Sequence, residues 1–355
     1  MAKLKQHYRI VFWCFLFVLY AFCAARPVPQ ELVLNSKWLV SLETSHPAPD
    51  LTGEFHPFIM GDRFGYINSE GQFSILQQKK GLISISHARW AEYLAAPSSI
   101  DIKDPLNKTV QTLQNPNGYP FFLDDKIFIM HKEQNTVSRV NEDGNEIWRY
   151  DFASTITCVD AANGYFLAGL LDGTIDLLDE NGRRAFFSEP SGSRLTAVYG
   201  CAIDAGGKKI AIISGRDDQR FVLIEYVGTI WRITYHEFLG DGLNRAVQVK
   251  FIDKGRRVAF EREDGIGIYD IAARTSTIVR LSGRIMSIDN DGANNLLFLI
   301  VEDAPEAKRL IAIGDDKQVL ISAPFKSASN FLYRHGNDLY VGGGNTLSAF
   351  TIEIK

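Results

Sequence analysis

Residues 166–183 read FLAGLLDGTIDLLDENGR and contain the turn chemistry on which the fold depends. Two short runs of apolar residues are joined by Asp172-Gly173 and followed by Asn181-Gly182. Asp-Gly between apolar runs supplies the positive backbone φ that a tight strand-to-strand turn requires. The stretch is therefore predicted to form a β-hairpin whose second strand leads into a further turn.

The same hairpin pattern returns along the chain. An apolar strand, a polar turn, a β-rich strand and a turn rich in Asp, Asn and Gly recur in residues 62–78, 135–152, 264–281, 307–325 and 344–355. If each unit has four strands, the third strands lie 36 to 47 residues apart, near Phe64, Ile100, Val137, Ile175, Val222, Ile266, Leu310 and Leu347. A period near forty with four strands per unit is the sequence sign of a β-propeller.

The two ends of the repeat region predict how the ring closes. The last unit, residues 329–355, has room for three strands only, whereas residues 36–43, SKWLVSLE, form an isolated predicted strand before the first unit. Trp38 in this strand matches Trp148 and Trp231, which open predicted fourth strands. A closing strand from the other end of the chain removes exposed sheet edges. We expect an all-β propeller of eight four-stranded blades, or seven if the first or second unit is an irregular excursion; residues 82–117 are the least regular.

The N-terminal residues are typical of an export signal or a membrane anchor. Lys3, Lys5 and Arg9 precede an uncharged run of sixteen residues, 10–25. Sixteen residues is long for a signal-peptide core and short for a spanning helix, which needs about twenty. An uncleaved transmembrane anchor, cleavage after Ala25 and a lipid-modified Cys23 therefore all stay open.

In each case the basic flank is predicted to stay in the cytoplasm while the rest is exported. The predicted division of the chain is a signal-anchor segment at 1–25, a tether at 26–35 and a propeller at 36–355. We expect the propeller at the periplasmic face of the inner membrane, or secreted or periplasmic after signal cleavage.

Composition narrows the functional classes. The chain has 355 residues, of which 46% are hydrophobic, so it can bury a large core. Its formal net charge is -4, and without the three basic residues of the N-terminal flank the remainder carries about -7. This charge disfavours a nucleic-acid partner.

Two cysteines of the predicted propeller occupy similar places in successive repeats. Cys158 and Cys201 each precede an Asp and a Gly-containing turn, so adjacent blades can bring them near each other. An exported domain permits a disulfide. Two small buried thiols are the alternative, because free cysteine packs well as a small hydrophobe.

Residues 173–182, with the form G-x-I-x-x-x-D-x-x-G, and the Ile-Trp pair that ends at Trp148 resemble the quinoprotein-type (PQQ-like) β-propellers and, more loosely, the WD-repeat group. The resemblance implies the fold over about residues 35–355. Members of that fold family include alcohol dehydrogenases that use pyrroloquinoline quinone and calcium, and anchored envelope scaffolds such as the propeller lipoprotein of the outer-membrane β-barrel assembly machinery. The enzymes carry an adjacent Cys-Cys pair, which this chain lacks, and no calcium or quinone ligand set can be matched residue by residue. We therefore expect no cofactor, and fold likeness alone does not carry function.

Catalytic and metal-binding motifs are also missing from the sequence. The histidines are scattered singly, with no spacing that would place two on one strand face: His7, His46, His56, His87, His131, His236 and His335. An Asp recurs near the end of each of several predicted innermost strands, at Asp160, Asp204, Asp253 and Asp289, and this repetition favours turn capping in each blade. We predict no catalytic residues and no metal site.

The preferred interpretation is a non-enzymatic, membrane-tethered scaffold that binds envelope or membrane proteins. Binding residues tend to lie on loops held by a rigid frame. The candidates come from three aromatic-rich stretches, 89–93, 235–245 and 333–335, and are Trp90, Tyr93, Tyr235, Phe238, Arg245, Tyr333 and Arg334. The alternative is a propeller enzyme or small-ligand sensor that uses the central channel. Its distinguishing feature would be polar side chains converging from the innermost strands of several blades.

Overall fold

The computed structural model describes residues 12–20, 31–48, 50–95, 97–189, 196–240, 242–289 and 295–354. The chain divides into two units, one made of Met1–Val33 with Glu353–Lys355 and the other of Leu34–Ile352. In the first unit, residues 12–20 are helical, and the remainder of the predicted anchor lies outside the described residues. Among the described residues, no helix has both the length and the apolar character needed to cross a membrane.

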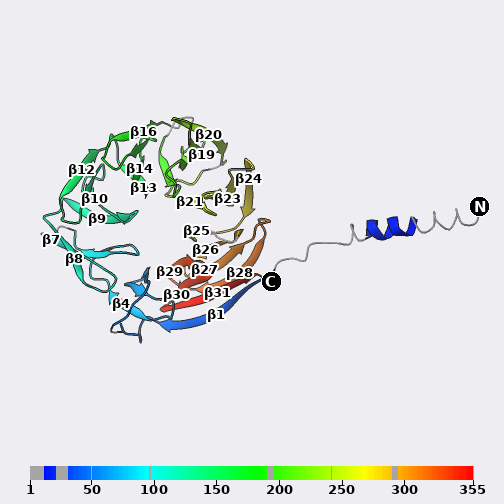
Figure 1. Ribbon diagram of the computed structural model, residues 1–355, viewed down its shortest axis with the longest axis horizontal. Coiled ribbons are helices and arrows are strands. Elements are labelled where there is room, and N and C mark those ends of the chain that lie inside the picture. Colours follow the sequence, from blue (N-terminus) through cyan, green and yellow to red (C-terminus); the bar gives the residue numbers. More distant parts are fainter. Residues whose placement is uncertain are drawn as a thin grey trace, which may run out of the picture. The chain divides into compact units, whose positions relative to one another are not determined.

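The second unit is built from eight antiparallel sheets that follow one another around a ring, as the repeat period predicts (Figure 1). We number them as blades 1 to 8 in chain order. Each blade packs one face against the next blade, so apolar side chains are buried between blades. Between blades 3 and 4, for example, Phe128, Trp148 and Phe166 pack together in a cluster of buried residues.

The strands of the first four blades are as follows. Blade 1 contains β2 (His56–Met60), β3 (Arg63–Ile67) and β4 (Phe73–Gln78), and blade 2 contains β5 (Leu82–Ile85), β6 (Trp90–Tyr93), β7 (Ser99–Lys103) and β8 (Thr109–Gln114). Blade 3 contains β9 (Gly118–Leu123), β10 (Lys126–His131), β11 (Thr136–Val140) and β12 (Glu146–Asp151), and blade 4 contains β13 (Ile156–Ala162), β14 (Tyr165–Leu170), β15 (Ile175–Leu178) and β16 (Arg184–Ser188).

The second half of the ring repeats this order. Blade 5 contains β17 (Val198–Ile203), β18 (Lys209–Ser214), β19 (Arg220–Val227) and β20 (Ile230–Phe238), and blade 6 contains β21 (Val249–Ile252), β22 (Arg257–Arg262), β23 (Gly265–Asp270) and β24 (Thr275–Arg280). Blade 7 contains β25 (Arg284–Ile288), β26 (Leu297–Ala304), β27 (Ala307–Ile313) and β28 (Val319–Lys326), and blade 8 contains β29 (Asn330–His335), β30 (Asp338–Gly343), β31 (Thr346–Ile354) and β1 (Leu32–Ser41).

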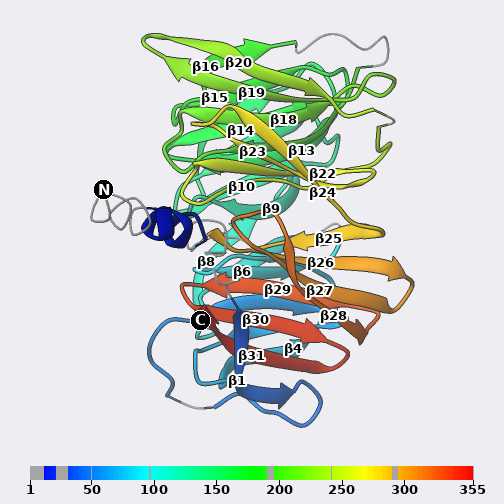
Figure 2. The same cartoon turned by 90° about the vertical axis from the view of Figure 1, so that its right-hand side faces the viewer.

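The ring closes as the sequence predicts. The N-terminal strand β1 pairs with β31 and becomes the outer strand of blade 8, beside three strands from the other end of the chain (Figure 2). The Leu42 backbone N–H donates to the Asn345 carbonyl at 2.8 Å, just past the paired strands. Eight blades are therefore present, and residues 82–117, the unit predicted to be least regular, form an ordinary four-stranded blade.

Two tryptophans on outer strands, Trp38 and Trp148, each join their blade to the next one. The Trp148 indole N–H of β12 donates to the Glu180 carbonyl at 3.1 Å, in the turn between β15 and β16. The Trp38 indole of β1 makes the same bond to the Ser69 carbonyl at 2.9 Å, between β3 and β4. The glycine in each of these turns has positive φ and no room for a side chain. A Cβ on Gly182 would lie 2.6 Å from the Trp148 ring.

Blade 1 differs from the expected four strands. The Trp38 bond marks the turn between β3 and β4 as the equivalent of the third-to-fourth strand turn of blade 4. The three strands of blade 1 thus correspond to the second, third and fourth strands of the other blades. Among the described residues of the preceding segment, 42–55, no innermost strand is present. β2 therefore comes next to β29, the innermost strand of blade 8.

The hairpin at residues 166–183 has the predicted turns. Gly173 and Gly182 both have positive φ. The Asp172 carboxylate accepts from the Thr174 backbone N–H at 3.0 Å. The Asp179 carboxylate accepts from the backbone N–H groups of Asn181 and Arg183 at 2.8 and 2.9 Å. Local hydrogen bonds of this kind explain why Asp recurs where one strand turns into the next.

Candidate functional site

A cavity of about 500 Å³ lies against the innermost strands of blades 4, 5 and 6. Its walls come from β13, β17 and β21 and from the turns that follow β17 and β21, and its polar side chains include Asp160, Lys250 and Lys254. An innermost strand has a free edge and lines the channel, so its side chains face one another across blades. The cavity thus has the feature expected of a central-channel site, polar groups from several blades.

Two half-buried charged side chains of this cavity, Asp160 and Lys250, are held by bonds to neighbouring blades. The Asp160 carboxylate accepts from the Ile203 backbone N–H of blade 5 at 2.9 Å and from the Ala161 N–H at 2.9 Å. Burial raises the pKa of Asp160, and these two bonds oppose the rise. The Lys250 ammonium donates to the Ile288 carbonyl of blade 7 at 3.0 Å. Burial lowers the pKa of Lys250, opposed by Asp289 and Asp160. Both side chains therefore connect blades as well as line the cavity.

The other recurring aspartates also make structural interactions. The Asp204 carboxylate accepts from the backbone N–H groups of Lys208 and Lys209 at 2.7 and 2.6 Å, which confirms the predicted turn cap. Asp253 forms a buried ion pair with Arg257. The carboxylates of Asp204 and Asp253 thus both bond to residues of their own blade.

Cys158 and Cys201 lie side by side on β13 and β17, as their equivalent places in adjacent repeats predict. Both are free thiols in the structure. The hydrogen bond between the two thiols raises the pKa of Cys201, and burial raises it further. The pair forms part of the apolar packing between blades 4 and 5.

The raised pKa of Cys201 predicts that its thiol is alkylated slowly in the folded protein. Alkylation requires the thiolate, so a raised pKa lowers the reactive fraction at any pH below it. We expect iodoacetamide at pH 8 to modify Cys201 at least about tenfold more slowly in the folded protein than in guanidinium. Mass spectrometry of the peptide containing Cys201 measures both rates. Equal rates would contradict the raised pKa of Cys201, and protection that persists in guanidinium until a reductant is added would reveal a disulfide.

The sequence-predicted partner-binding residues divide into buried and exposed groups. Trp90, Tyr93 and Arg334 are buried within the propeller, with 3%, 8% and 0% of their surface exposed, so they offer little or no area to a partner. Tyr235 is half-buried and stacks on Tyr269 with ring centroids 4.0 Å apart.

The remaining three candidates have different surroundings. Arg245 forms an ion pair with the buried Glu261 at 2.5 Å. Tyr333 is half-buried beside the His56 ring, with centroids 5.0 Å apart. Phe238 is 58% exposed, and the Arg220 guanidinium lies over its ring at 5.2 Å. Phe238 is thus the most exposed apolar member of the predicted set.

Phe238 belongs to an exposed apolar edge that sequence reasoning did not single out. It ends β20, the nine-residue outer strand of blade 5, which also exposes Ile230 and Ile233. The last two residues of β19, Tyr226 and Val227, are exposed as well. Among the described strands, only β19 pairs with β20, so the opposite edge of β20 is open. The available signal was the high content of Ile, Val, Tyr and Phe on both sides of the turn at Gly228.

The described residues contain one group with the side chains of a metal site, and it lies apart from the cavity. Glu54, His56 and His335 come together where blade 8 meets blade 1. Their sequence spacing carried no sign of this, because His56 and His335 belong to opposite ends of the repeat region.

Comparison with known proteins agrees with the architecture. The chain is 26% identical over 298 residues to an uncharacterized protein of Treponema pallidum (strain Nichols), covering 81% of this chain and 78% of the relative. Among solved structures, BamB from Moraxella catarrhalis superposes with a TM-score of 0.60 at 13% identity, covering 90% of this chain and 100% of that one.

Two further solved structures share the fold. A chain of the Mitotic Checkpoint Complex gives a TM-score of 0.55 at 12% identity, over 92% of this chain and 94% of that one. The computationally designed Ika8 protein gives 0.60 at 11% identity, over 89% and 99%. A family model described as β-propeller protein matches residues 1–355. The chain therefore belongs to this family of β-propeller proteins.

Proposed function

We propose that this protein is a non-enzymatic, exported and membrane-tethered propeller that binds other proteins of the cell envelope through the outer edge of blade 5. The observation that carries the proposal is the exposed apolar character of β20, with Ile230 at 48%, Ile233 at 49% and Phe238 at 58% exposure. Single exposed apolar residues are ordinary, but several on one open sheet edge favour an interaction site.

The chemistry of this edge suits an extended segment of a partner protein. An edge strand offers unpaired backbone N–H and C=O groups, to which a partner strand can add by main-chain hydrogen bonds. The apolar side chains of β20 would then contact alternate side chains of the added strand. Nine residues give room for such pairing, whereas β16, the outer strand of blade 4, has only five.

The envelope location is supported by the N-terminus. A basic flank followed by the apolar run 10–25 is typical of a segment that remains at, or passes through, a membrane while the rest is exported. The likeness in fold to BamB and to a chain of the Mitotic Checkpoint Complex supports a role for the propeller in protein assemblies.

Substitution of the β20 edge should abolish partner binding. We expect the triple variant Ile230→Ser, Ile233→Ser and Phe238→Ser to reduce recovery of cross-linked envelope proteins at least about tenfold, because the loss of buried apolar area at an interface centre costs several kcal/mol. Quantitative mass spectrometry after cross-linking in native membranes measures the recovery. Since all three side chains are exposed, the thermal transition should stay near that of the wild type.

A matched control uses exposed apolar residues on other outer strands. Val110, Ile147 and Val319 lie on β8, β12 and β28 with exposures of 51%, 47% and 41%. Their combined replacement by Ser should leave recovery unchanged. Equal loss in both triple variants would indicate nonspecific binding by exposed apolar residues. Full recovery with the β20 variant would remove this edge from the proposal and favour the cavity at Asp160 and Lys250 as a small-ligand site, the second candidate function.

A further inference from the structure

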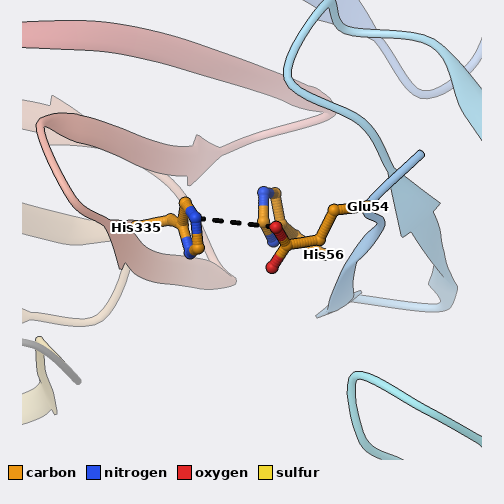
Figure 3. A group of neighbouring side chains, drawn as sticks. All are labelled: Glu54, His56 and His335. Atoms are coloured by element: carbon orange, nitrogen blue, oxygen red, sulfur yellow. Dashed lines mark ion pairs between the residues drawn. The ribbon is translucent and has the colours of Figure 1, made fainter.

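The junction of blades 8 and 1 brings together three side chains of metal-binding type. Glu54 precedes β2, His56 is the first residue of β2, and His335 is the last residue of β29 (Figure 3). The two strands come from opposite ends of the repeat region and meet only because the ring closes. Blade 1 lacks an innermost strand among the described residues, so β2 lies next to β29 instead of behind another strand.

The distances fit a site that closes around one small cation. The ligand atoms of the three side chains all lie within 4.8 Å of one another. The His335 Nε2 is 3.6 Å from the Glu54 Oε2. Tetrahedral Zn²⁺ with bonds of 2.0–2.1 Å holds neighbouring ligand atoms about 3.4 Å apart. The Glu54–His335 pair is thus already near this separation. Rotation of these two exposed side chains can shorten their distances to His56.

His56 supplies an independent sign that a partner from outside the chain belongs here. Its side chain is only 3% exposed, and its Nδ1 is buried without a hydrogen-bond partner among the described residues. A buried polar atom without a hydrogen bond lowers the stability of the fold by roughly 1–3 kcal/mol. The ring is packed by Tyr340, whose centroid is 5.0 Å away, and by His335 at 5.1 Å. Packing thus holds the imidazole at the edge of the group.

The donor set and its exposure indicate which ion would bind, and how. Two imidazoles and one carboxylate form a three-ligand set that Zn²⁺ uses when its fourth position is open to water. Hard ions such as Mg²⁺ and Ca²⁺ prefer oxygen ligands instead. The side chains of Glu54 and His335 are 66% and 53% exposed, so the outer side of the site faces solvent.

We propose that Glu54, His56 and His335 bind a divalent transition metal ion, with Zn²⁺ the best match, which links β29 of blade 8 to β2 of blade 1 and keeps one coordination position open. The ion would act at the junction where the ring closes, between strands from opposite ends of the repeat region. The three ligands come together only in the folded chain. Binding of the ion should therefore stabilise the closed ring against unfolding.

Isothermal titration of ZnCl₂ into chelator-treated, untagged protein tests the site directly. We expect an equimolar Zn²⁺ ion to bind and to raise the thermal transition by a few degrees, a rise that EDTA reverses. His335→Gln and Glu54→Gln should each weaken Zn²⁺ binding at least about tenfold. Loss of a side chain that only supports a metal ligand already has an effect of this size, and loss of the ligand itself costs no less. Without metal, both variants should unfold at the wild-type temperature because their side chains are mostly exposed.

The His87–Asp125 pair provides a matched control. It is another exposed histidine and carboxylate, 3.2 Å apart, with side chains 64% and 62% exposed, but within the part of the chain that the structure describes no second histidine completes a site. His87→Gln should leave Zn²⁺ binding unchanged. The proposal is overturned if the metal-free protein takes up no Zn²⁺, if His335→Gln binds as well as the wild type, or if His87→Gln is equally impaired. Replacement of the two thiols by Ser, which should have no effect, separates this site from Cys158 and Cys201.

Discussion

Replacing Arg334 by methionine should lower the free energy of unfolding by about 3–5 kcal/mol, because removal of one partner of a buried ion pair leaves the other charge uncompensated. Arg334 is fully buried on β29, and its Nη1 lies 3.6 Å from the Asp289 carboxylate, which is equally buried. Its guanidinium also donates to the Leu296 carbonyl of blade 7 at 3.1 Å and lies over the Phe298 ring at 5.5 Å. Equilibrium denaturation measures the effect.

The exposed pair Arg149 and Asp151 is the control for this experiment. Their side chains are 3.3 Å apart and 49% and 65% exposed, so water screens the charges. Arg149→Met should change the stability by less than about 1 kcal/mol. If both variants had equally small effects, Arg334 would not be the connection between blades 7 and 8 that its contacts indicate. Loss of partner binding by Arg334→Met without loss of stability would instead support its sequence-predicted role at a binding surface.

A chain that begins at residue 43 should fail to form a soluble monomer, whereas one that begins at residue 31 should fold. The shorter chain lacks β1, so the outer edge of β31 is exposed and open to pairing with other molecules. It also loses Trp38, which packs against Tyr340 with centroids 5.9 Å apart and bonds to the Ser69 carbonyl of blade 1. The fourth strand of blade 8 and the Trp38 bond to blade 1 would be lost together.

Size-exclusion chromatography and chemical denaturation of the two truncated chains test the closure. We expect the shorter chain to aggregate or to unfold at a clearly lower denaturant concentration, since many backbone bonds and a large aromatic side chain are lost at once. Two chains with the same midpoint and the same monomeric elution would show that β1 contributes little to the ring.

The architecture could be predicted from the sequence because its causes are local. A turn such as Asp172-Gly173 needs positive φ at the glycine, and an Asp carboxylate bonds to backbone N–H groups a few residues away. Repetition of that chemistry about every forty residues implies blades, and an isolated strand at one end with a three-stranded unit at the other implies closure. The position of Trp38 on an outer strand followed from the same comparison of repeats.

Tertiary structure decided the candidate sites, because they depend on contacts between residues far apart in the chain. His56 and His335 are single histidines in the sequence and neighbours only after the ring has closed. Arg334 follows Tyr333 in an aromatic-rich stretch, and whether it faced solvent or the interior depended on how β29 packs against blade 7. The sequence also did not reveal that, among the described residues, blade 1 has no innermost strand, because a strand is defined by its pairing. The sequence by itself determined the repeat and its closure through local turn chemistry, whereas burial and convergence of side chains required the folded ring.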